Sequence, residues 1–114
     1  MVQSVTPSAL AAMSSAPGEG ARIDIVDVRD PDEWQTGYIA GARLIPLEQL
    51  RADPDAVLQR GSVIVFVCAK GIRSLQAAKL ADRFGYESIY HLAGGVREWE
   101  RAGYSLASDQ RVAA

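Results

Sequence analysis

The sequence of 114 residues has a formal net charge of −2, from 12 basic and 14 acidic side chains, with 48% hydrophobic and 23% charged residues. This length and composition are typical of one soluble globular domain with a single core. They exclude a nucleic-acid binder that depends on a basic surface and a protein that spans a membrane, because no basic run stands out and no apolar stretch approaches the ~20 residues that a bilayer requires.

The first predicted elements are a capped helix and a buried strand. The Thr-Pro pair at residues 6–7 predicts a helix start, because a hydroxyl caps the first turn and proline fits its first position. Proline and glycine within residues 17–20 end that helix. Residues 23–28 predict a strand, and we expect Asp27 and Arg29 at its end to brace the neighbouring loops.

A second capping pattern follows this strand. Asp30 precedes a proline and stands three residues before Glu33, an arrangement that predicts a short helix with a capping box. We expect this helix to bury Trp34. Residues 42–45 predict a short strand that a proline interrupts, and residues 53–59 predict another helix, which begins at an Asp-Pro pair.

The middle of the chain predicts a strand followed by an amphipathic helix. The apolar run at residues 63–67 is typical of a strand buried on both faces of a parallel sheet. Residues 75–84 then have helical periodicity, and Gly85 is expected to follow the helix in the left-handed conformation. The predicted apolar face holds Ala77, Ala78, Ala81 and Phe84, and the polar face holds Gln76, Lys79 and Arg83.

The last part of the chain completes an alternating pattern. Residues 88–91 predict a short strand, Gly94-Gly95 turns the chain into a final helix, and residues 107–114 are expected to fray. Strands that alternate with helices over short connections predict an open α/β sheet with helices on both faces. We expect a single domain over residues 1–114, with its core at about residues 6–106.

The only cysteine, Cys68, stands between the central strand and the helix that follows it. A thiol at this place meets converging backbone N–H groups, and these groups, like neighbouring cations, favour the thiolate over the thiol. The alternative is a buried cysteine that acts as a small hydrophobic side chain. Because one cysteine forms no internal disulfide and a reactive thiol survives best in a reducing compartment, we expect a cytoplasmic protein.

Three stretches of the sequence occur in a fixed order. They are Asp27-Val28-Arg29 with Glu33-Trp34 and Gly37-Tyr38-Ile39-x-Gly41-Ala42, then Cys68-x-x-Gly71-x-Arg73-Ser74, then Leu92-x-Gly94-Gly95-x-x-x-Trp99-x-x-x-Gly103. Together they resemble the rhodanese-like domain family of single-cysteine sulfurtransferases. The resemblance implies a five-stranded parallel sheet with the reactive loop at its carboxyl edge. Tyr38 departs from the family, which usually has histidine there, but sulfur transfer needs no proton shuttle once the thiolate exists.

The resemblance implies a thiosulfate sulfurtransferase that needs no cofactor. Cys68 is the implied catalytic nucleophile, which takes a sulfane sulfur from a small anionic donor such as thiosulfate and holds it as a persulfide. The acceptor is cyanide, a small thiol or a protein thiol. The implied active-site and substrate-binding loop comprises Ala69, Lys70, Gly71, Ile72, Arg73 and Ser74. A metal site is not expected, because one cysteine and one histidine do not supply the usual ligand set.

Several of these residues have two interpretations. Lys70 attracts the anionic donor or is a solvated cation. Arg73 meets the oxyanion of the donor or braces the loop through a salt bridge. Ser74 hydrogen-bonds the sulfur or, more plainly, caps the following helix. Gly71 lets the backbone close tightly. Asp27, Arg29 and Glu33 are expected to brace the structure internally, and Arg29 is alternatively expected to border the pocket.

Two other functions compete with this interpretation. Cysteine phosphatases and arsenate reductases wrap an oxyanion in a Cys-x5-Arg loop, whereas only four residues separate Cys68 from Arg73. A non-catalytic or sulfur-carrier module would use the same fold for protein contacts, because a fold alone does not settle function. Donor preference in a direct assay distinguishes a carrier from an enzyme that uses thiosulfate.

The histidine and the two tryptophans are expected to be structural. His91 ends a predicted strand far along the sequence from the loop, so we expect a surface residue or one with satisfied hydrogen bonds. Trp34 and Trp99 are expected in the core without a stacking role. None of the three is assigned a part in the chemistry.

Overall fold

The computed structural model describes residues 1–15 and 23–108 of the chain. Within these ranges the strands form one five-stranded sheet in the order β1-β5-β4-β2-β3, and every pair of neighbours is parallel. The strands are β1 Val2–Val5, β2 Ile23–Asp27, β3 Arg43–Leu44, β4 Val63–Val67 and β5 Ile89–Leu92. The predicted open α/β sheet is therefore confirmed.

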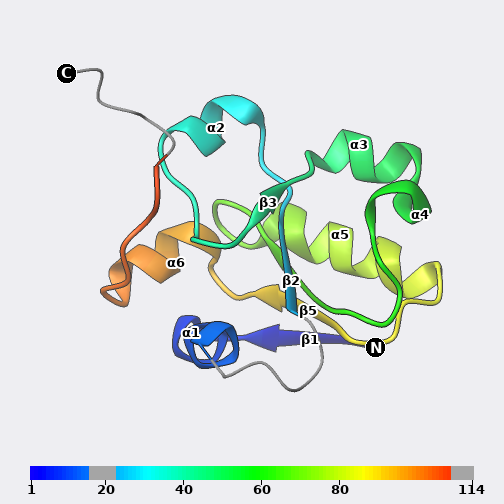
Figure 1. Ribbon diagram of the computed structural model, residues 1–114, viewed down its shortest axis with the longest axis horizontal. Helices are drawn as coiled ribbons and strands as arrows, with labels where there is room; N and C mark the ends of the chain where they lie inside the picture. Colours follow the sequence, from blue (N-terminus) through cyan, green and yellow to red (C-terminus); the bar gives the residue numbers. More distant parts are fainter. Residues whose placement is uncertain (16–22, 109–114) are drawn as a thin grey trace.

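Helices cover both faces of this sheet, as predicted. They are α1 Pro7–Ser15, α2 Pro31–Gln35, α3 Leu47–Ala52, α4 Pro54–Val57, α5 Ile72–Arg83 and α6 Gly95–Arg101. One apolar cluster joins a sheet face to α3 and α5, which contribute Leu50 and Ala78, and a second joins the other face to α1 and α6 through Leu10 and Trp99. Figure 1 shows α3, α4 and α5 on one side of the strands and α1 and α6 on the other.

The central strand β4 belongs to both clusters, which explains its uninterrupted apolar run. Ile64 and Phe66 pack into the α5 side, whereas Val65 and Val67 pack into the α1 and α6 side. All four side chains are at most 1% exposed. In a parallel sheet covered on both faces, a polar residue at any of these positions would lose hydration without gaining a partner.

Helix α5 begins earlier than the apolar period indicated. It starts at Ile72, directly after Gly71, whose φ of 99° is open to glycine and strained for other residues. The predicted inner face of alanines is buried, which confirms that part of the pattern. Phe84 was assigned to the same face, but this is wrong: it follows the last helical residue and is 44% exposed. Gly85 has the expected left-handed φ, 85°.

Two elements, β1 and α3, were not predicted from the sequence. Strand β1 lies at the sheet edge with only Val5 buried, so its sequence carries no apolar run. Helix α3 follows Pro46 immediately and buries Leu47 and Leu50. Its six residues are too few to show a helical period of apolar residues, and they follow directly after the short predicted strand and its proline.

Several predicted ends were correct and others were not. Ala9 N donates to Thr6 Oγ1 at 3.1 Å, which confirms the cap of α1. The helix expected over 53–59 ends at Val57, because Leu58 turns to an extended conformation. The predicted stop at 17–20 and most of the predicted tail, residues 109–114, lie outside the described residues.

Residue 107, the first of the predicted frayed tail, is paired in the structure. Ala107 N donates to Tyr38 O at 2.7 Å, and Tyr38 N donates to Ala107 O at 3.0 Å. Two reciprocal backbone hydrogen bonds tie this part of the chain to the segment after α2. The ordered chain therefore continues past the point where fraying was expected.

The two tryptophans differ in burial, and both stack. Trp99 is 7% exposed, as expected of a core residue, but its ring stacks on Tyr104 at 4.6 Å between centroids. Trp34 is only half-buried and stacks on Tyr38 at 3.8 Å. The expectation that α2 buries Trp34 was therefore wrong, because this helix has no buried residue. Both stacking contacts lie within the fold and assign neither tryptophan a part in the chemistry.

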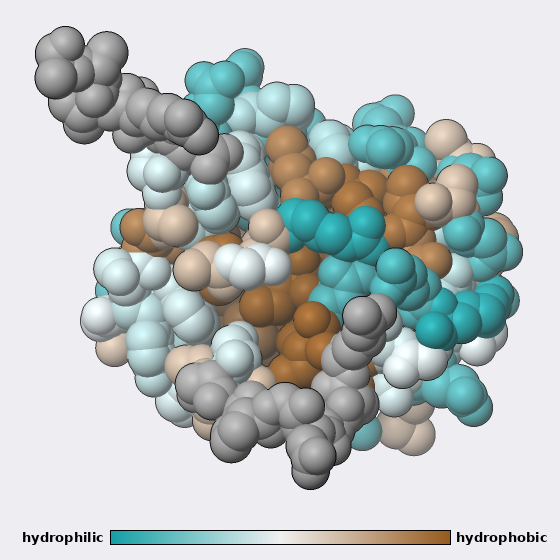
Figure 2. Space-filling view, viewed as in Figure 1, coloured by the Kyte–Doolittle hydropathy of each residue, from teal (hydrophilic) through white to brown (hydrophobic). Residues whose placement is uncertain are grey.

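The surface is mixed in character. Figure 2 shows apolar residues gathered in the middle of one face, with hydrophilic residues around them. Within the part of the chain that the structure describes, no helix is both long and apolar enough to cross a membrane.

Candidate active site

The sulfur of Cys68 lies at the carboxyl end of β4, in the loop that leads into α5. Its Sγ accepts a hydrogen bond from Gly71 N at 3.0 Å and lies 3.4 Å from Ser74 Oγ, with which it is also hydrogen-bonded. Backbone N–H groups that point into such a turn create a local site for an anion. The Gly71 N–H therefore already donates to the atom on which a negative charge would form, whereas the Ser74 hydroxyl accepts from the thiol.

Ser74 touches the sulfur rather than capping the helix. The N-cap of α5 is Gly71, and Ser74 stands inside the first turn with no exposed surface. The plainer of its two predicted roles, the cap, is therefore wrong. Its buried hydroxyl has the thiol as its partner, which avoids the cost of an unsatisfied polar group.

Helix α6 holds the loop from one side through backbone atoms. Val96 N donates to Cys68 O at 2.8 Å, and Arg97 N donates to Ala69 O at 3.1 Å. A Cβ at Gly95 would lie 2.3 Å from Cys68 O, so only glycine allows this approach. The two carbonyl oxygens, which carry partial negative charge, therefore accept hydrogen bonds from α6.

The glycine pair was interpreted from the sequence only as a turn into a helix. That turn is confirmed, since Gly94 is the N-cap of α6 and has a φ of 75°. The additional role of Gly95, as the contact surface for the Cys68 loop, was missed. The sequence signal was the pair itself, but its partner lies 27 positions earlier, and no local pattern reveals that contact.

Helix α2 holds the same loop from another side through an ion pair. Arg73 Nη1 and Nη2 donate to Glu33 Oε1 and Oε2 at 2.7 and 2.8 Å. Glu33 Oε1 also accepts from Asp30 N at 3.1 Å, which completes the predicted capping box of α2. Of the two interpretations of Arg73, the geometry is that of a brace.

Glu33 and Arg73 each stabilise the charged form of the other. The hydrogen bonds from Arg73 lower the pKa of Glu33 to about 2, against an opposing effect of burial and with help from the Asp30 N–H. The same contact raises the pKa of Arg73. Glu33 therefore stays ionised throughout the neutral range, and one carboxylate both caps α2 and fixes the loop.

Arg29 is an internal brace. Its guanidinium donates from Nη2 to Asp27 Oδ2 and to Gly37 O, both at 2.8 Å. Only 3% of the residue is exposed, and it does not line the pocket beside Cys68. The structure thus places Arg29 in the bracing role that was also expected of Asp27, behind the site rather than at its border.

An open pocket of about 290 Å³ leads to the sulfur. It is lined by Glu33, Cys68, Ala69, Lys70, Ile72 and Arg73. Lys70 is exposed and Ile72 is 67% exposed, whereas Cys68 is 1% exposed. The structure therefore brings most of the predicted loop residues together around one opening, adds Glu33 to them, and places the buried thiol among the residues that line it.

His91 is buried rather than at the surface, at 8% exposed, and does not line this pocket. Its Nε2 is hydrogen-bonded to Ser4 Oγ at 3.0 Å, while Nδ1 has no partner among the described residues. Burial lowers the pKa of His91, which favours the neutral ring. The structural interpretation fits, but the expectation of full satisfaction fails at Nδ1. The described residues contain no group of three or more side chains that suits a metal ion.

Comparison with known proteins gives one consistent result. The family described as the Rhodanese-like domain matches residues 6–102. Over 89 residues the chain is 35% identical to the thiosulfate sulfurtransferase GlpE of Shewanella oneidensis, covering 74% of this chain and 82% of that protein. Over 78 residues it is 36% identical to the uncharacterized protein YqhL of Bacillus subtilis, covering 68% of this chain and 61% of that protein, so it spans less than two thirds of this relative.

Solved structures agree with the sequence comparison. The rhodanese-like domain of the Anabaena sp. Alr3790 protein superposes with a TM-score of 0.81 at 28% identity. The match covers 100% of this chain and 86% of that one. The predicted family fold is therefore confirmed.

Proposed function

This chain belongs to the rhodanese-like domain family, and on that premise we propose that it is a thiosulfate sulfurtransferase with Cys68 as its nucleophile. The observation that carries the proposal is the position of the Cys68 sulfur. Sγ accepts the Gly71 N–H at 3.0 Å and lies at the base of an open pocket. The relative in Shewanella oneidensis is a thiosulfate sulfurtransferase, and the same activity is our proposal for this chain.

In the first step the Cys68 thiolate attacks the terminal sulfane sulfur of thiosulfate. A new S–S bond forms on Sγ, and the S–S bond of thiosulfate breaks with its electron pair leaving on sulfite. The terminal sulfur of the resulting persulfide carries negative charge. The Gly71 N–H and the Ser74 hydroxyl contact Sγ, the atom to which this sulfur is bonded, and we expect them to stabilise the charge on the persulfide.

In the second step an acceptor, which is cyanide or a thiolate, attacks the terminal sulfur of the persulfide. The Sγ–S bond breaks, its electron pair returns to Cys68 as a thiolate, and the acceptor leaves with the transferred sulfur. Atoms and charges balance without a cofactor. Lys70 at the pocket opening favours the approach of an anionic donor by long-range attraction.

The state of Arg73 supports sulfur transfer over phosphoryl transfer. A cysteine phosphatase uses a bidentate arginine to bind phosphate oxygens, but both terminal nitrogens of Arg73 already bind Glu33. We also propose that the chain acts as one domain, because both of its apolar clusters share one sheet. A reducing compartment such as the cytoplasm fits a mechanism that needs a free thiol.

The test is the intact mass of the reduced protein before and after incubation with thiosulfate. We expect the mass to rise by one sulfur atom and cyanide to remove it with the release of thiocyanate. Cys68→Ser, which is nearly isosteric, should keep the fold and take up no sulfur. Sulfur uptake or turnover by Cys68→Ser would contradict the assignment. No uptake and no turnover by the wild-type protein would favour the carrier module, which is then tested with a protein persulfide as the donor.

A further inference from the structure

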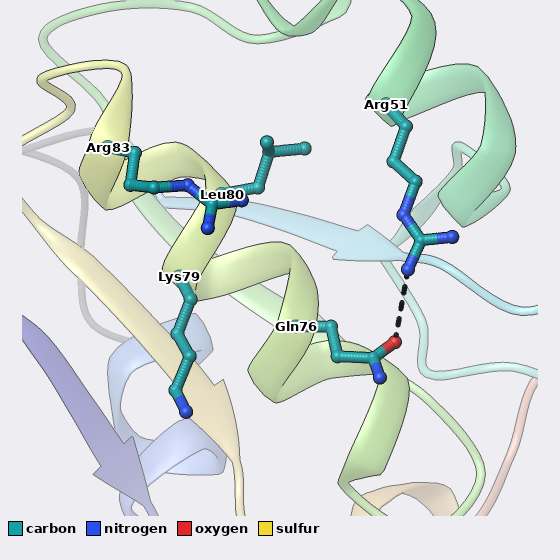
Figure 3. A pocket seen from close by; sticks show the side chains of 5 residues that line it. All are labelled: Arg51, Gln76, Lys79, Leu80 and Arg83. Atoms are coloured by element: carbon teal, nitrogen blue, oxygen red, sulfur yellow. Dashed lines mark hydrogen bonds between the residues drawn. The ribbon is translucent and has the colours of Figure 1, made fainter.

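A second pocket lies on the outer side of α5, away from the Cys68 opening. It has a volume of about 330 Å³ and is lined by Arg51 from α3 and by Gln76, Lys79, Leu80 and Arg83 from α5. Figure 3 shows Arg51 reaching from α3 towards Gln76, with Lys79, Leu80 and Arg83 following along α5. Three of the five lining residues are cations, in a chain whose net charge is −2.

These cations are poorly neutralised. Arg51 Nη2 donates to Gln76 Oε1 at 3.4 Å, and its Nη1 lies 3.7 Å from the carboxylate of Glu48, which is itself 89% exposed. Neither Lys79 nor Arg83 has a carboxylate within 4.0 Å among the described residues. The α3–α5 groove therefore presents net positive charge to solvent.

The same helix face connects this groove to the opening beside Cys68. Ile72, Gln76, Lys79 and Arg83 stand at i, i+4, i+7 and i+11 on α5, so they form one stripe along the helix. All four are exposed, and Ile72, which lines the Cys68 pocket, is 67% exposed. An apolar contact point at the reactive opening thus continues into a cationic groove.

We infer that this stripe is the docking surface for a protein sulfur acceptor that has acidic residues beside its reactive thiol. The inference rests on the proposed function. The thiolate of the acceptor takes the terminal sulfur of the Cys68 persulfide, whose S–S bond breaks with the electron pair returning to Cys68. The stripe extends about 16 Å from Ile72 to Arg83 at the helical rise per residue, which an extended segment of about five residues covers.

The charge pattern favours a protein over a small anion. A small anion would be held by convergent donors, whereas Lys79 and Arg83 follow one another along α5, Arg51 comes from α3, and the stripe begins at an exposed isoleucine. A protein acceptor gains from both parts, because the apolar contact excludes water near the sulfur and the charges steer the approach. Attraction of this kind weakens as salt shortens the Debye length to about 8 Å at physiological ionic strength.

The probe is a fluorescent peptide with one serine followed by a run of glutamates, compared with the same peptide carrying glutamines. Serine in place of the thiol makes the measurement one of binding alone. By fluorescence anisotropy at low salt we expect the acidic peptide to bind about tenfold more tightly than its neutral form. The double variant Lys79→Glu with Arg83→Glu should lose that preference, and salt should weaken it.

The matched control is Arg101→Glu, which reverses an exposed charge on α6, across the sheet from α5. It should keep the preference for the acidic peptide. Equal binding of the two peptides, or an equal loss of preference in Arg101→Glu, would overturn the inference. Inorganic pyrophosphate that binds the wild-type protein more tightly than the peptide does would also overturn it, since the groove would then be a small-anion site.

The thiosulfate–cyanide reaction of the wild-type protein is measured alongside. Turnover without a preference for the acidic peptide leaves the sulfurtransferase standing and removes the docking surface. A charge-dependent preference without turnover of thiosulfate removes the proposed enzyme and leaves the stripe as a docking surface of the carrier module. Turnover together with the preference supports both.

Discussion

Helices α6 and α2 both hold the loop that carries Cys68, but one does so with backbone atoms and the other with charged side chains. On the α6 side, two N–H groups bind the carbonyls of Cys68 and Ala69, and Gly95 allows the close approach. On the α2 side, Glu33 binds Arg73, and about a third of each side chain is exposed.

This difference predicts different sensitivities. A backbone contact depends on shape and is changed by any added atom, whereas a partly exposed ion pair depends on pH and salt. A single substitution can therefore remove the α6 contact or the α2 contact without the other.

The largest effect is expected from Gly95→Ala. The new Cβ would lie 2.3 Å from Cys68 O at a φ of 65°, so the loop or the helix must move. Left-handed strain costs about 1–2 kcal/mol, and forced packing adds about 1–3 kcal/mol. We expect a clear loss of unfolding free energy in urea together with a large fall in sulfur transfer.

Gly103→Ala is the matched control for that substitution. Gly103 has a φ of 99°, but a Cβ there meets nothing within 4 Å, so only the backbone strain is added. It should destabilise the protein by about 1–2 kcal/mol and leave the transfer rate of the folded protein unchanged. If the two variants behave alike, the contact between α6 and the loop has no special role.

The next effect tests the ion pair through its pH dependence. The pKa of Glu33 is lowered from 4.5 to about 2, so its stabilising contribution is present above pH 4.5 and is lost as the pH falls towards 2. Because the pair is partly screened, we expect Glu33→Gln to cost about 1 kcal/mol or less at pH 7. Thermal unfolding of the two proteins should converge as the pH falls through that window.

Glu98→Gln serves as the control for the pH series. It removes a carboxylate whose pair with Arg101 is exposed and 3.6 Å long, so its unfolding temperature should stay close to the wild-type value at each pH. A gap between Glu33→Gln and the wild-type protein that stays constant down to pH 2 would show that the loss arises from packing and not from charge.

The smallest effect is expected from Lys70→Ala, which alters the opening and neither of the two holding contacts. Lys70 is exposed and lines the pocket, so its contribution to an anionic donor is that of a solvated charge. We expect the KM for thiosulfate to rise about threefold to fivefold, with kcat nearly unchanged. Arg101→Ala, a charge removed from α6, should leave KM as it is, and an unaltered KM in Lys70→Ala would make Lys70 a solvated cation without a role.

The parts of the fold that follow from local pattern were predictable. The apolar run of β4, the capping box at Asp30 and the alanine face of α5 each occupy a few adjacent positions, and all three are confirmed. Phe84 was misassigned because the apolar period continues past the point where Gly85 ends the helix. Strand β1 was missed because an edge strand can leave most of its side chains exposed.

In the candidate site, too, local motifs were predictable and contacts between distant positions were not. The loop from Cys68 to Ser74 was predicted from its resemblance to the family, which its short local motif and the two flanking motifs made visible. Glu33 and Arg73 were each expected to brace, but their pairing was not predicted, because 40 positions separate them. The contact of Gly95 with Cys68 was missed for the same reason. Glu33 was correctly assigned as a capping residue, but nothing near it in the sequence shows that both of its carboxylate oxygens also bind Arg73 of the loop.

The backbone contact between α6 and the loop also bears on how such an active site changes over time. Hydrogen bonds to the carbonyls of Cys68 and Ala69 require no particular side chain at positions 69, 70 and 72, although these positions line the opening. The frame that holds the sulfur and the side chains that meet its reactants are therefore separable. Under the proposed function, we expect substitutions at positions 69, 70 and 72 to change the preference for donors and acceptors while Cys68 keeps its place.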